Sequence, residues 1–396
     1  MKSEWKTVEL SDVIIDIAAG PFGSNLKVSC FVPYGFPIID GANLKGFKVT
    51  DNVTKFVTEE KARSLARSIA KRGDVVVTIS GTLGQIAYIP QDSEFPEYLC
   101  SQRQFRVTFD ESRVYVPYLV FYFHTYEGKN KILSFANQTG VPALSQPLKN
   151  FKKIIVNLPD LQTQKKIAKV IEDFNDKIAL NNKINDNLEQ QAQAIFYRYF
   201  IDIDKIPDGW SVGCLLDIAD YRNGLAMQKY RPATGEVGLP VLKIKELRQG
   251  NCDAMSELCS PNINTDYIVC DGDVVFSWSG SLLVDLWCGG TCGLNQHLFK
   301  VTSAKYDKWF YYLWTKYYLD RFVAIAADKA TTMGHIKREE LSKAEVIIPS
   351  SQDYQEIGAA LRPMIDLIIA NRIENRKLAA LRDMLLPKLM AGEIDI

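Results

Sequence analysis

The sequence of 396 residues lacks the short motifs that mark most enzymes. It has no G-x-x-x-x-G-K-[ST] phosphate loop, and the nearest stretch, residues 80–84 (SGTLG), has no lysine where one is needed. H-E-x-x-H, G-x-S-x-G and C-x-x-C are absent, as is the Asn-Pro-Pro or Asp-Pro-Pro motif of adenine methyltransferases. Carboxylates are plentiful, so an enzyme with an unmarked carboxylate site is the least favoured interpretation. We expect a binding and assembly protein, not an enzyme, with no cofactor or metal of its own.

Targeting and membrane signals are also missing. The first residues, MKSEWKTVEL, lack an apolar signal core, and no apolar run approaches membrane-spanning length. The eight cysteines have no metal-site spacing and only three scattered histidines beside them, so buried free thiols in a reducing compartment are the better interpretation. We expect a cytoplasmic protein with no membrane partner. The formal net charge is zero, which neither favours nor excludes nucleic acid, because a local basic face would not show in the sum.

What the sequence does contain is an apolar seam over residues 162–199, spaced alternately by four and three. Its positions are Ile167, Ile171, Phe174, Ile178, Asn181, Asn185, Leu188, Ala192, Ile195 and Tyr199. The same seam recurs 190 residues later, at Ile357, Leu361, Met364, Ile368, Asn371, Asn375, Leu378, Arg382, Leu385 and Leu389. This spacing predicts two long amphipathic helices, each packed against another helix.

Two asparagines interrupt each seam near its middle. An asparagine in an apolar seam costs stability and fixes register, because its amide needs a polar partner across the interface. Antiparallel pairing would bring Asn181 and Asn185 together with Asn371 and Asn375. We therefore predict that the two helices pair with each other, and not that they are unrelated surface helices. Pro363 is expected to kink the second helix or mark its first turn, and the second helix is expected to weaken or stop about Pro387.

The segments that precede the two seams repeat as well. Gly73-Asp74-Val75-Val76 with Ser80-Gly81 recurs as Gly272-Asp273-Val274-Val275 with Ser279-Gly280. The offset falls from 205 (Trp5 to Trp210) to 190 (Pro159 to Pro349) while the order is kept, so one unit is used twice. Short β-branched runs predict strands at 74–79, 273–276, 153–156 and 345–348, with aromatic-rich helices at 116–126 and 308–321.

An α+β protein with a pseudo-two-fold repeat follows from these patterns. Two mixed, mainly β globular parts, residues 1–158 and 206–349, are joined by two long antiparallel helices. The central helix occupies residues 159–205, and the distal helix with the C-terminal tail occupies residues 350–396. A chain of this length and composition can bury full cores in two or three domains.

Loops between the predicted strands are rich in glycine, hydroxyl, amide and basic residues. Such side chains read base edges and hold phosphates, although solvated loops are the plain alternative. The candidate DNA contacts in the first unit are Lys27, Ser80, Thr82, Gln102, Arg103 and Thr139. Those in the second unit are Arg222, Lys243, Lys245, Gln296, His297, Thr332, His335 and Lys337. Gln102 and Gln296 are paired by the repeat, and glutamine can bond adenine at two positions.

Three motifs give this pattern a family resemblance. They are residues 158–164 (LPDLQTQ), 333–337 (MGHIK) and 386–394 (LPKLMAGEI), and with the repeat the chain resembles the specificity subunit of type I restriction-modification systems over essentially its whole length. The second copy departs from the first at residues 350–354, where Tyr354 stands in place of Gln164. That difference argues against a role specific to the glutamine side chain.

The resemblance implies two target recognition domains, each reading one half of a bipartite double-stranded DNA sequence. The paired helices would hold them apart and act as a ruler on the spacer. Two modification (methyltransferase) subunits would bind the helices and carry S-adenosylmethionine for adenine methylation, and two restriction subunits can join them to translocate and cleave DNA with ATP and Mg. The rival interpretation is a protein-binding adaptor built from two repeats, which would not show the steep loss of affinity with salt that counterion release gives a DNA reader.

Overall fold

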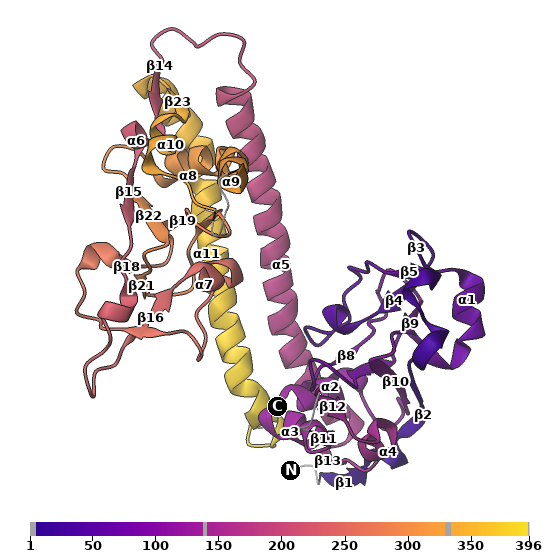
Figure 1. The fold of residues 1–396 in the computed structure, drawn as a ribbon. Helices are drawn as coiled ribbons and strands as arrows, with labels where there is room; N and C mark the ends of the chain where they lie inside the picture. The colour runs from indigo at the N-terminus through magenta and orange to yellow at the C-terminus, as the bar shows by residue number, and fades with distance from the viewer. Residues whose placement is uncertain (1–4, 138–140, 329–333, 395) are drawn as a thin grey trace. The chain divides into compact units, whose positions relative to one another are not determined.

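The computed structural model describes residues 5–137, 141–328, 334–394 and 396 (Figure 1). It contains two compact units, the first formed by residues up to 175 together with those from 380 onward, and the second by residues 176–379. Two helices of 40 residues, α5 (Leu161–Phe200) and α11 (Ser351–Met390), supply segments to both units. Mixed sheets and helices in each unit confirm the predicted α+β class.

The first unit is built mainly from short strands. They are β1 (Lys6–Glu9), β2 (Ile14–Ala19), β3 (Phe31–Val32), β4 (Phe36–Ile39), β5 (Phe56–Val57), β6 (Ile69–Lys71), β7 (Val75–Thr78), β8 (Ile86–Tyr88), β9 (Glu97–Cys100), β10 (Gln104–Phe109), β11 (Ala136–Asn137), β12 (Ala143–Leu144) and β13 (Ile155–Leu158). Its helices besides α5 and α11 are α1 (Glu59–Ser64), α2 (Val116–His124), α3 (Tyr126–Leu133) and α4 (Pro147–Lys152). Short 3-10 turns are η1 (Leu10–Asp12), η2 (Gly23–Asn25), η3 (Val28–Cys30), η4 (Gly41–Asn43) and η5 (Ala66–Ser68).

The second unit has a parallel set of elements. Its strands are β14 (Ser211–Cys214), β15 (Asp220–Asn223), β16 (Leu239–Leu242), β17 (Leu258–Cys259), β18 (Ile268–Val269), β19 (Val274–Ser277), β20 (Leu283–Leu286), β21 (Cys292–Leu294), β22 (Leu298–Thr302) and β23 (Glu345–Ile348). Its helices are α6 (Leu215–Ile218), α7 (Ile244–Gln249), α8 (Lys308–Tyr317), α9 (Leu319–Asp328) and α10 (Arg338–Ser342), with 3-10 turns η6 (Met227–Lys229) and η7 (Thr265–Tyr267).

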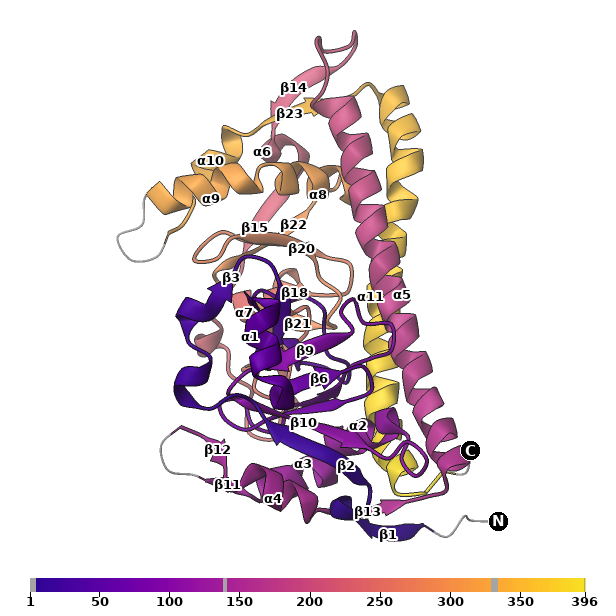
Figure 2. The ribbon, with the colours of Figure 1, turned by 90° about the vertical axis from the view of Figure 1, so that its right-hand side faces the viewer.

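Both units share one topology. The sheet β2-β10-β7-β8 of the first unit matches β15-β22-β19-β20 of the second strand by strand. The sheet β5-β4-β9-β6, to which β3 adds an edge, matches β17-β16-β21-β18. In both, one equivalent pair is parallel, β4 with β9 and β16 with β21. In the first unit, β6, β9 and α1 lie on one side of β10 and β2, and α3 and α4 lie on the other (Figure 2). The predicted internal repeat is confirmed.

The repeated Gly-Asp pair that flagged the duplication has a structural cause. Gly73 and Gly272 both adopt left-handed backbone conformations, with φ of 89° and 86°, before the central strands β7 and β19. Each following aspartate then accepts a hydrogen bond from the backbone three residues earlier, Asp74 from Lys71 N at 3.0 Å and Asp273 from Cys270 N at 2.8 Å. A side chain at the glycine would be strained, so the motif is fixed by the turn.

Each unit is closed by pairing its first strand with the strand that precedes its long helix. β1 pairs antiparallel with β13, and β14 pairs antiparallel with β23. The predicted strand at 153–156 was placed too early, because α4 extends to Lys152 and β13 runs from Ile155 to Leu158. The prediction for residues 345–348 is confirmed by β23.

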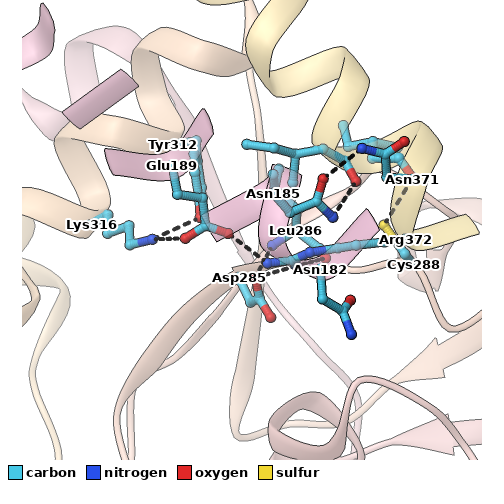
Figure 3. A network of polar contacts seen from close by, with 12 residues as sticks. Asn182, Asn185, Glu189, Asp285, Leu286, Cys288, Tyr312, Lys316, Asn371 and Arg372 are labelled. Atoms are coloured by element: carbon cyan, nitrogen blue, oxygen red, sulfur yellow. Dashed lines mark hydrogen bonds and ion pairs between the residues drawn. The ribbon is translucent and has the colours of Figure 1, made fainter. Parts of the chain in front are cut away.

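Within the second unit, α5 and α11 pair through the predicted asparagines, and Figure 3 shows one of these pairs, Asn185 with Asn371. Asn371 Nδ2 donates to Asn185 Oδ1 at 2.9 Å, and Asn181 Nδ2 donates to Asn375 Oδ1 at 2.8 Å. Numbers that rise along one helix fall along the other, so the pairing is antiparallel, as predicted. Flanking seam positions Ile171, Leu361 and Ile368 are buried in their units, and Phe174, Ile178 and Met364 are half-buried.

In the first unit, the start of α5 packs with the end of α11. Leu386, Leu389 and Met390 are buried in the core that also contains Ile167 and Ile171. The helix was predicted to weaken or stop about Pro387, and α11 ends three residues further on, at Met390. The ring of Pro387 is exposed, and burial of the apolar side chains on both sides of it keeps the segment helical at the expense of one backbone donor. Pro363 likewise lies exposed inside α11, beyond its first turn.

The end of α5 departs from the predicted seam. Tyr199 is 41% exposed, whereas Phe196 and Phe200 are buried at 1%. These two rings contact Trp314 of α8, with centroids 5.0 and 5.7 Å away. The last turns of α5 therefore bury the face that meets α8, and the seam position Tyr199 is left in solvent.

Candidate nucleic-acid interface

A hollow of about 690 Å³ lies in the first unit between the ends of its two sheets. Four of the six predicted contacts line it: Ser80 and Thr82 after β7, and Gln102 and Arg103 in the turn from β9 to β10. We call it the first-unit hollow. The other polar or charged side chains that line it are Asp40, Lys55, Thr78, Gln85, Ser101 and Gln104, and the remaining lining residues are the apolar or small Leu26, Val28, Phe31, Ile38, Gly41, Ala42 and Gly81. The hydroxyl, amide and charged groups are of the kind that bond base edges and phosphates.

The Ser-Gly loop after β7 is held by the segment that leads into β12. Ser80 bridges Ala143, and Gly81 N donates to Pro142 O at 3.0 Å. Gly81 has a φ of 93°, and the Arg103 guanidinium lies 3.7 Å from where a Cβ would stand. The left-handed backbone favours a glycine there, whereas a Cβ would meet the arginine only at ordinary van der Waals distance. Thr139 lies outside the described residues.

Gln102 was predicted to bond adenine at two positions, but its amide nitrogen is bonded to the protein backbone instead. Its Nε2 donates to Gly23 O at 2.6 Å and to Leu26 O at 3.0 Å, so both amide protons are used inside the protein. Only Oε1 is left to bond a base, and a glutamine needs both its amide groups for the two-point contact with adenine. Gln102 therefore anchors the loop of residues 20–27 to the turn from β9 to β10.

The first-unit hollow contains both a carboxylate and basic side chains, so it can bond donor and acceptor groups of a ligand. Burial raises the pKa of Asp40, but bonds from Lys55 and Ala42 N outweigh it and leave that pKa below its usual value, so the carboxylate is ionised. Asp40 and Lys55 are paired at 2.6 Å. In the part of the chain that the structure describes, the side chains of Arg103 and Lys27 have no ion-pair partner. Lys27 is exposed beside the hollow and does not line it.

The corresponding place in the second unit holds a polar and aromatic group that we call the second-unit cluster: Trp278, Ser279, Gln296, His297 and His335. Ser279 bridges His335 as Ser80 bridges Ala143, and Gly280 N bonds Gly334 O at 2.9 Å as Gly81 bonds Pro142. His297 Nδ1 is 2.9 Å from Ser279 Oγ, and its Nε2 is 3.3 Å from Gln296 Nε2. The Trp278 ring lies 6.0 Å from His297 and 6.3 Å from His335.

Three of the eight predictions for the second unit thus come together, and Trp278 was missed. The tryptophan directly precedes the repeated Ser-Gly pair, so the internal repeat could have pointed to it. Its Nε1 donates to Asn223 Oδ1 at 3.0 Å, another residue that the sequence did not single out. Lys337 is exposed at the start of α10. Thr332 lies outside the described residues.

Three of the four lysines and arginines predicted to contact DNA in the second unit are already paired. Arg222 contacts Asp266 at 2.6 Å, Lys243 pairs with Glu257, and Lys245 contacts Asp253 at 3.2 Å. All three pairs are substantially exposed, so they are weak and can exchange for phosphate. None of their acidic partners belongs to the second-unit cluster.

Gln164 and Tyr354, the residues at which the two copies differ, make equivalent hydrogen bonds in the two units. Gln164 is buried, and its Oε1 accepts from Tyr115 N at 2.9 Å, directly before α2. Tyr354 Oη accepts from Asp307 N at 2.6 Å, directly before α8. Two different side chains thus cap the equivalent helix from the first turns of α5 and α11, and neither belongs to the candidate interface.

Across the described ranges, no three His, Cys, Asp or Glu side chains are grouped so as to hold a metal ion. None of the described helices combines the length and apolar character that crossing a bilayer demands. The eight cysteines are unbridged; four are buried, three half-buried, and Cys270 is exposed, contrary to the expectation that all would be buried.

Comparison with known proteins agrees with this architecture. The family model for the type I restriction modification DNA specificity domain matches residues 2–190 and 207–381, and the chain belongs to that family. The specificity subunit of the MjaIX type I restriction enzyme of Methanocaldococcus jannaschii is 24% identical over 99% of this chain and 94% of that protein. The HindI specificity subunit of Haemophilus influenzae is 23% identical, over 83% and 88%.

A solved structure shares the fold. The S subunit of a type I restriction-modification system from M. genitalium superposes with a TM-score of 0.58 at 13% identity, covering 98% of this chain and 96% of that one. The chain is thus a type I restriction-modification specificity subunit in family and in fold.

Proposed function

We propose that each unit of this chain recognises one half of a bipartite DNA target. The observation that carries the proposal is that one topology occurs twice and brings the same two loops together each time, the Ser-Gly loop and the segment before β12 or α10. A repeated reader is suited to a split site, with each copy bonding its own base pairs. The different side chains in the two copies support two different half-sites.

The chemistry of the two loops supports contact with base edges. Ser80, Thr82 and Arg103 in the first-unit hollow offer hydroxyl and guanidinium groups, and arginine bonds the O6 and N7 of guanine in two places. In the second-unit cluster, Gln296 and His335 offer an amide and an imidazole. A well-placed two-point contact contributes about 1–3 kcal/mol of discrimination against a wrong base.

The long helices support a spacing role. A helix of 40 residues is about 60 Å long at ~1.5 Å per residue, which is the length of roughly 18 base pairs of duplex at ~3.4 Å each. We propose that the paired helices set the spacer between half-sites. They also offer the surface on which two modification subunits bind, and restriction subunits join through them. S-adenosylmethionine, ATP and Mg belong to those partners, and this chain is non-catalytic.

The test is to express the chain with modification subunits in a host and map N6-methyladenine. The proposal predicts one bipartite motif with a fixed spacer, absent when the chain is omitted. Affinity of the purified complex for that duplex should fall steeply between about 50 and 200 mM salt, as counterion release requires. No methylated motif, together with affinity indifferent to salt, would favour the protein-binding adaptor.

A further inference from the structure

Phe22 is an exposed aromatic residue on a loop that is firmly anchored. Its side chain is 79% exposed, and Asn25 N donates to its carbonyl at 3.1 Å. On one side Pro21 is buried, and on the other Leu26 is buried in a cluster with Phe36 and other apolar residues. A ring left in water on a fixed loop is not explained by the core, since Pro21 and Leu26 already hold the loop.

Gln102 and Gly20 hold the loop beside the first-unit hollow. Gln102 bonds the carbonyls of Gly23 and Leu26, as described above. Gly20 N donates to Gln104 O at 2.8 Å, and a Cβ on Gly20 would stand 1.8 Å from Ser101 O. The loop that carries Phe22 is thus fixed on the same turn that carries Arg103.

The surroundings of Phe22 match the surface of a duplex. Leu26 of the same loop and Val28, which begins η3 directly after it, line the hollow, and Val28 is 81% exposed. Arg103, with no ion-pair partner among described residues, supplies positive charge for phosphate or guanine. The base edges of the major groove carry one apolar group, the C5-methyl of thymine, and phenylalanine is among the side chains that contact it.

The second unit offers an internal comparison. Gly224 occupies the place of Gly20: its N donates to Leu298 O at 3.0 Å, and a Cβ there would lie 2.2 Å from Asn295 O. Two residues later the second unit has Ala226, which is half-buried, where the first unit has Phe22. The exposed aromatic side chain at this position is thus a feature of the first unit, and the two copies differ in chemistry at an equivalent position.

We propose that Phe22 contacts a thymine methyl group in the half-site read by the first unit, and that Gln102 is the positioning residue that holds it there. The inference rests on the proposed function, because it assigns one contact within a half-site. It makes the first unit a partly apolar reader of its half-site.

The experiment uses the complex with modification subunits and its mapped duplex, with each thymine of the first-unit half-site replaced in turn by deoxyuridine. Wild type should lose roughly four-fold in affinity at one position, the loss expected for one unburied methyl. Phe22→Ala should bind the thymine duplex roughly ten-fold more weakly and show no loss at that position. Gln102→Glu, which cannot donate to Gly23 O and Leu26 O, should also lose this discrimination. Tyr34→Ala, which removes an aromatic ring that is 87% exposed in the turn between β3 and β4, should behave as wild type.

Uracil substitutions in the other half-site should affect wild type and Phe22→Ala equally. Equal discrimination by wild type and Phe22→Ala in the first half-site would overturn the inference while leaving the proposed function standing. Weaker assembly of Phe22→Ala with modification subunits, at unchanged DNA affinity, would assign the ring to a protein contact and overturn it too. Failure of the wild-type complex to bind its mapped duplex would instead sink the proposed function itself.

Discussion

Replacing Arg372 by methionine should destabilise the second unit. From α11, the guanidinium donates to Asp285 Oδ1 at 2.7 Å, Leu286 O at 3.1 Å and Glu189 Oε1 at 2.9 Å (Figure 3). Glu189 of α5 also accepts from Lys316 of α8 at 2.9 Å. One side chain thus ties α11 to α5 and to β20. Methionine keeps the volume of the aliphatic stem and removes every one of these bonds.

The expected loss is about 2 kcal/mol in the free energy of unfolding. Breaking a fully buried ion pair costs about 3–5 kcal/mol, and an exposed pair contributes about 0–1 kcal/mol. The side chains of Arg372, Glu189 and Asp285 are 27%, 29% and 29% exposed, which places the network between these limits. Arg362→Met is the matched control. Arg362 makes one ion pair from the same helix, with Asp307 at 2.6 Å, and both partners are about 40% exposed, so its loss should stay below about 1 kcal/mol.

The pH dependence has a definite sign. Burial raises the pKa of Glu189, but the charges of Lys316 and Arg372 outweigh it and hold that pKa below its ordinary value. A lowered carboxyl pKa contributes stability above the unfolded pKa of about 4.3, and this stability is lost as pH falls through the folded pKa. The difference in the free energy of unfolding between wild type and Arg372→Met should therefore become smaller as pH falls from 6 to 3.5.

Urea unfolding followed by tryptophan fluorescence measures this directly, because five of the six tryptophans lie in the second unit. They are Trp210, Trp278, Trp287, Trp309 and Trp314. The reasoning would be refuted if Arg372→Met and Arg362→Met lowered the free energy of unfolding equally. It would also be refuted if the difference in this free energy between wild type and Arg372→Met grew as pH fell.

Three further predictions concern the helices and their caps. Asn371→Ala should lower the free energy of unfolding, measured in urea, by about 1–3 kcal/mol, because Asn185 Oδ1 loses its donor. The double variant Asn185→Leu with Asn371→Leu should be near neutral, because both partners are replaced by apolar groups. A double variant that is strongly destabilised would contradict this. Gln164→Ala should cost about 1–3 kcal/mol and Tyr354→Phe about 1 kcal/mol, with DNA half-sites unchanged by methylation mapping; altered half-sites would place these residues in recognition. Inserting seven residues into each long helix, which keeps the seam and adds ~10 Å, should lengthen the mapped spacer by about three base pairs; an unchanged spacer would rule out the ruler.

The helix pairing could be predicted because periodicity is a local property. Seam positions are set by helical geometry alone. The buried amides of Asn181 and Asn185 need polar partners across the interface, and the second seam provides them at Asn371 and Asn375. The end of α5 could not be predicted, since burial of Phe196 and Phe200 depends on where α8 packs.

The candidate site was predictable at the level of loops and less so at the level of single side chains. The repeat located the Ser-Gly loops and the turns with Gln102 and Gln296, which do line the hollow and the cluster. It did not show that Gln102 donates to Gly23 O, or that Lys243 meets Glu257, because these partners lie 79 and 14 residues away in the sequence. Such contacts are fixed by the tertiary fold, and periodicity carries no information about them.

The central claim is that the two units read separate halves of one target. The most direct measurement exchanges residues 1–158 for the corresponding part of another specificity subunit and maps N6-methyladenine in cells that also express the modification subunits. The account predicts that one half of the methylated sequence changes to that of the donor while the other half and the spacer stay the same. A change in both halves, or in neither, would contradict it.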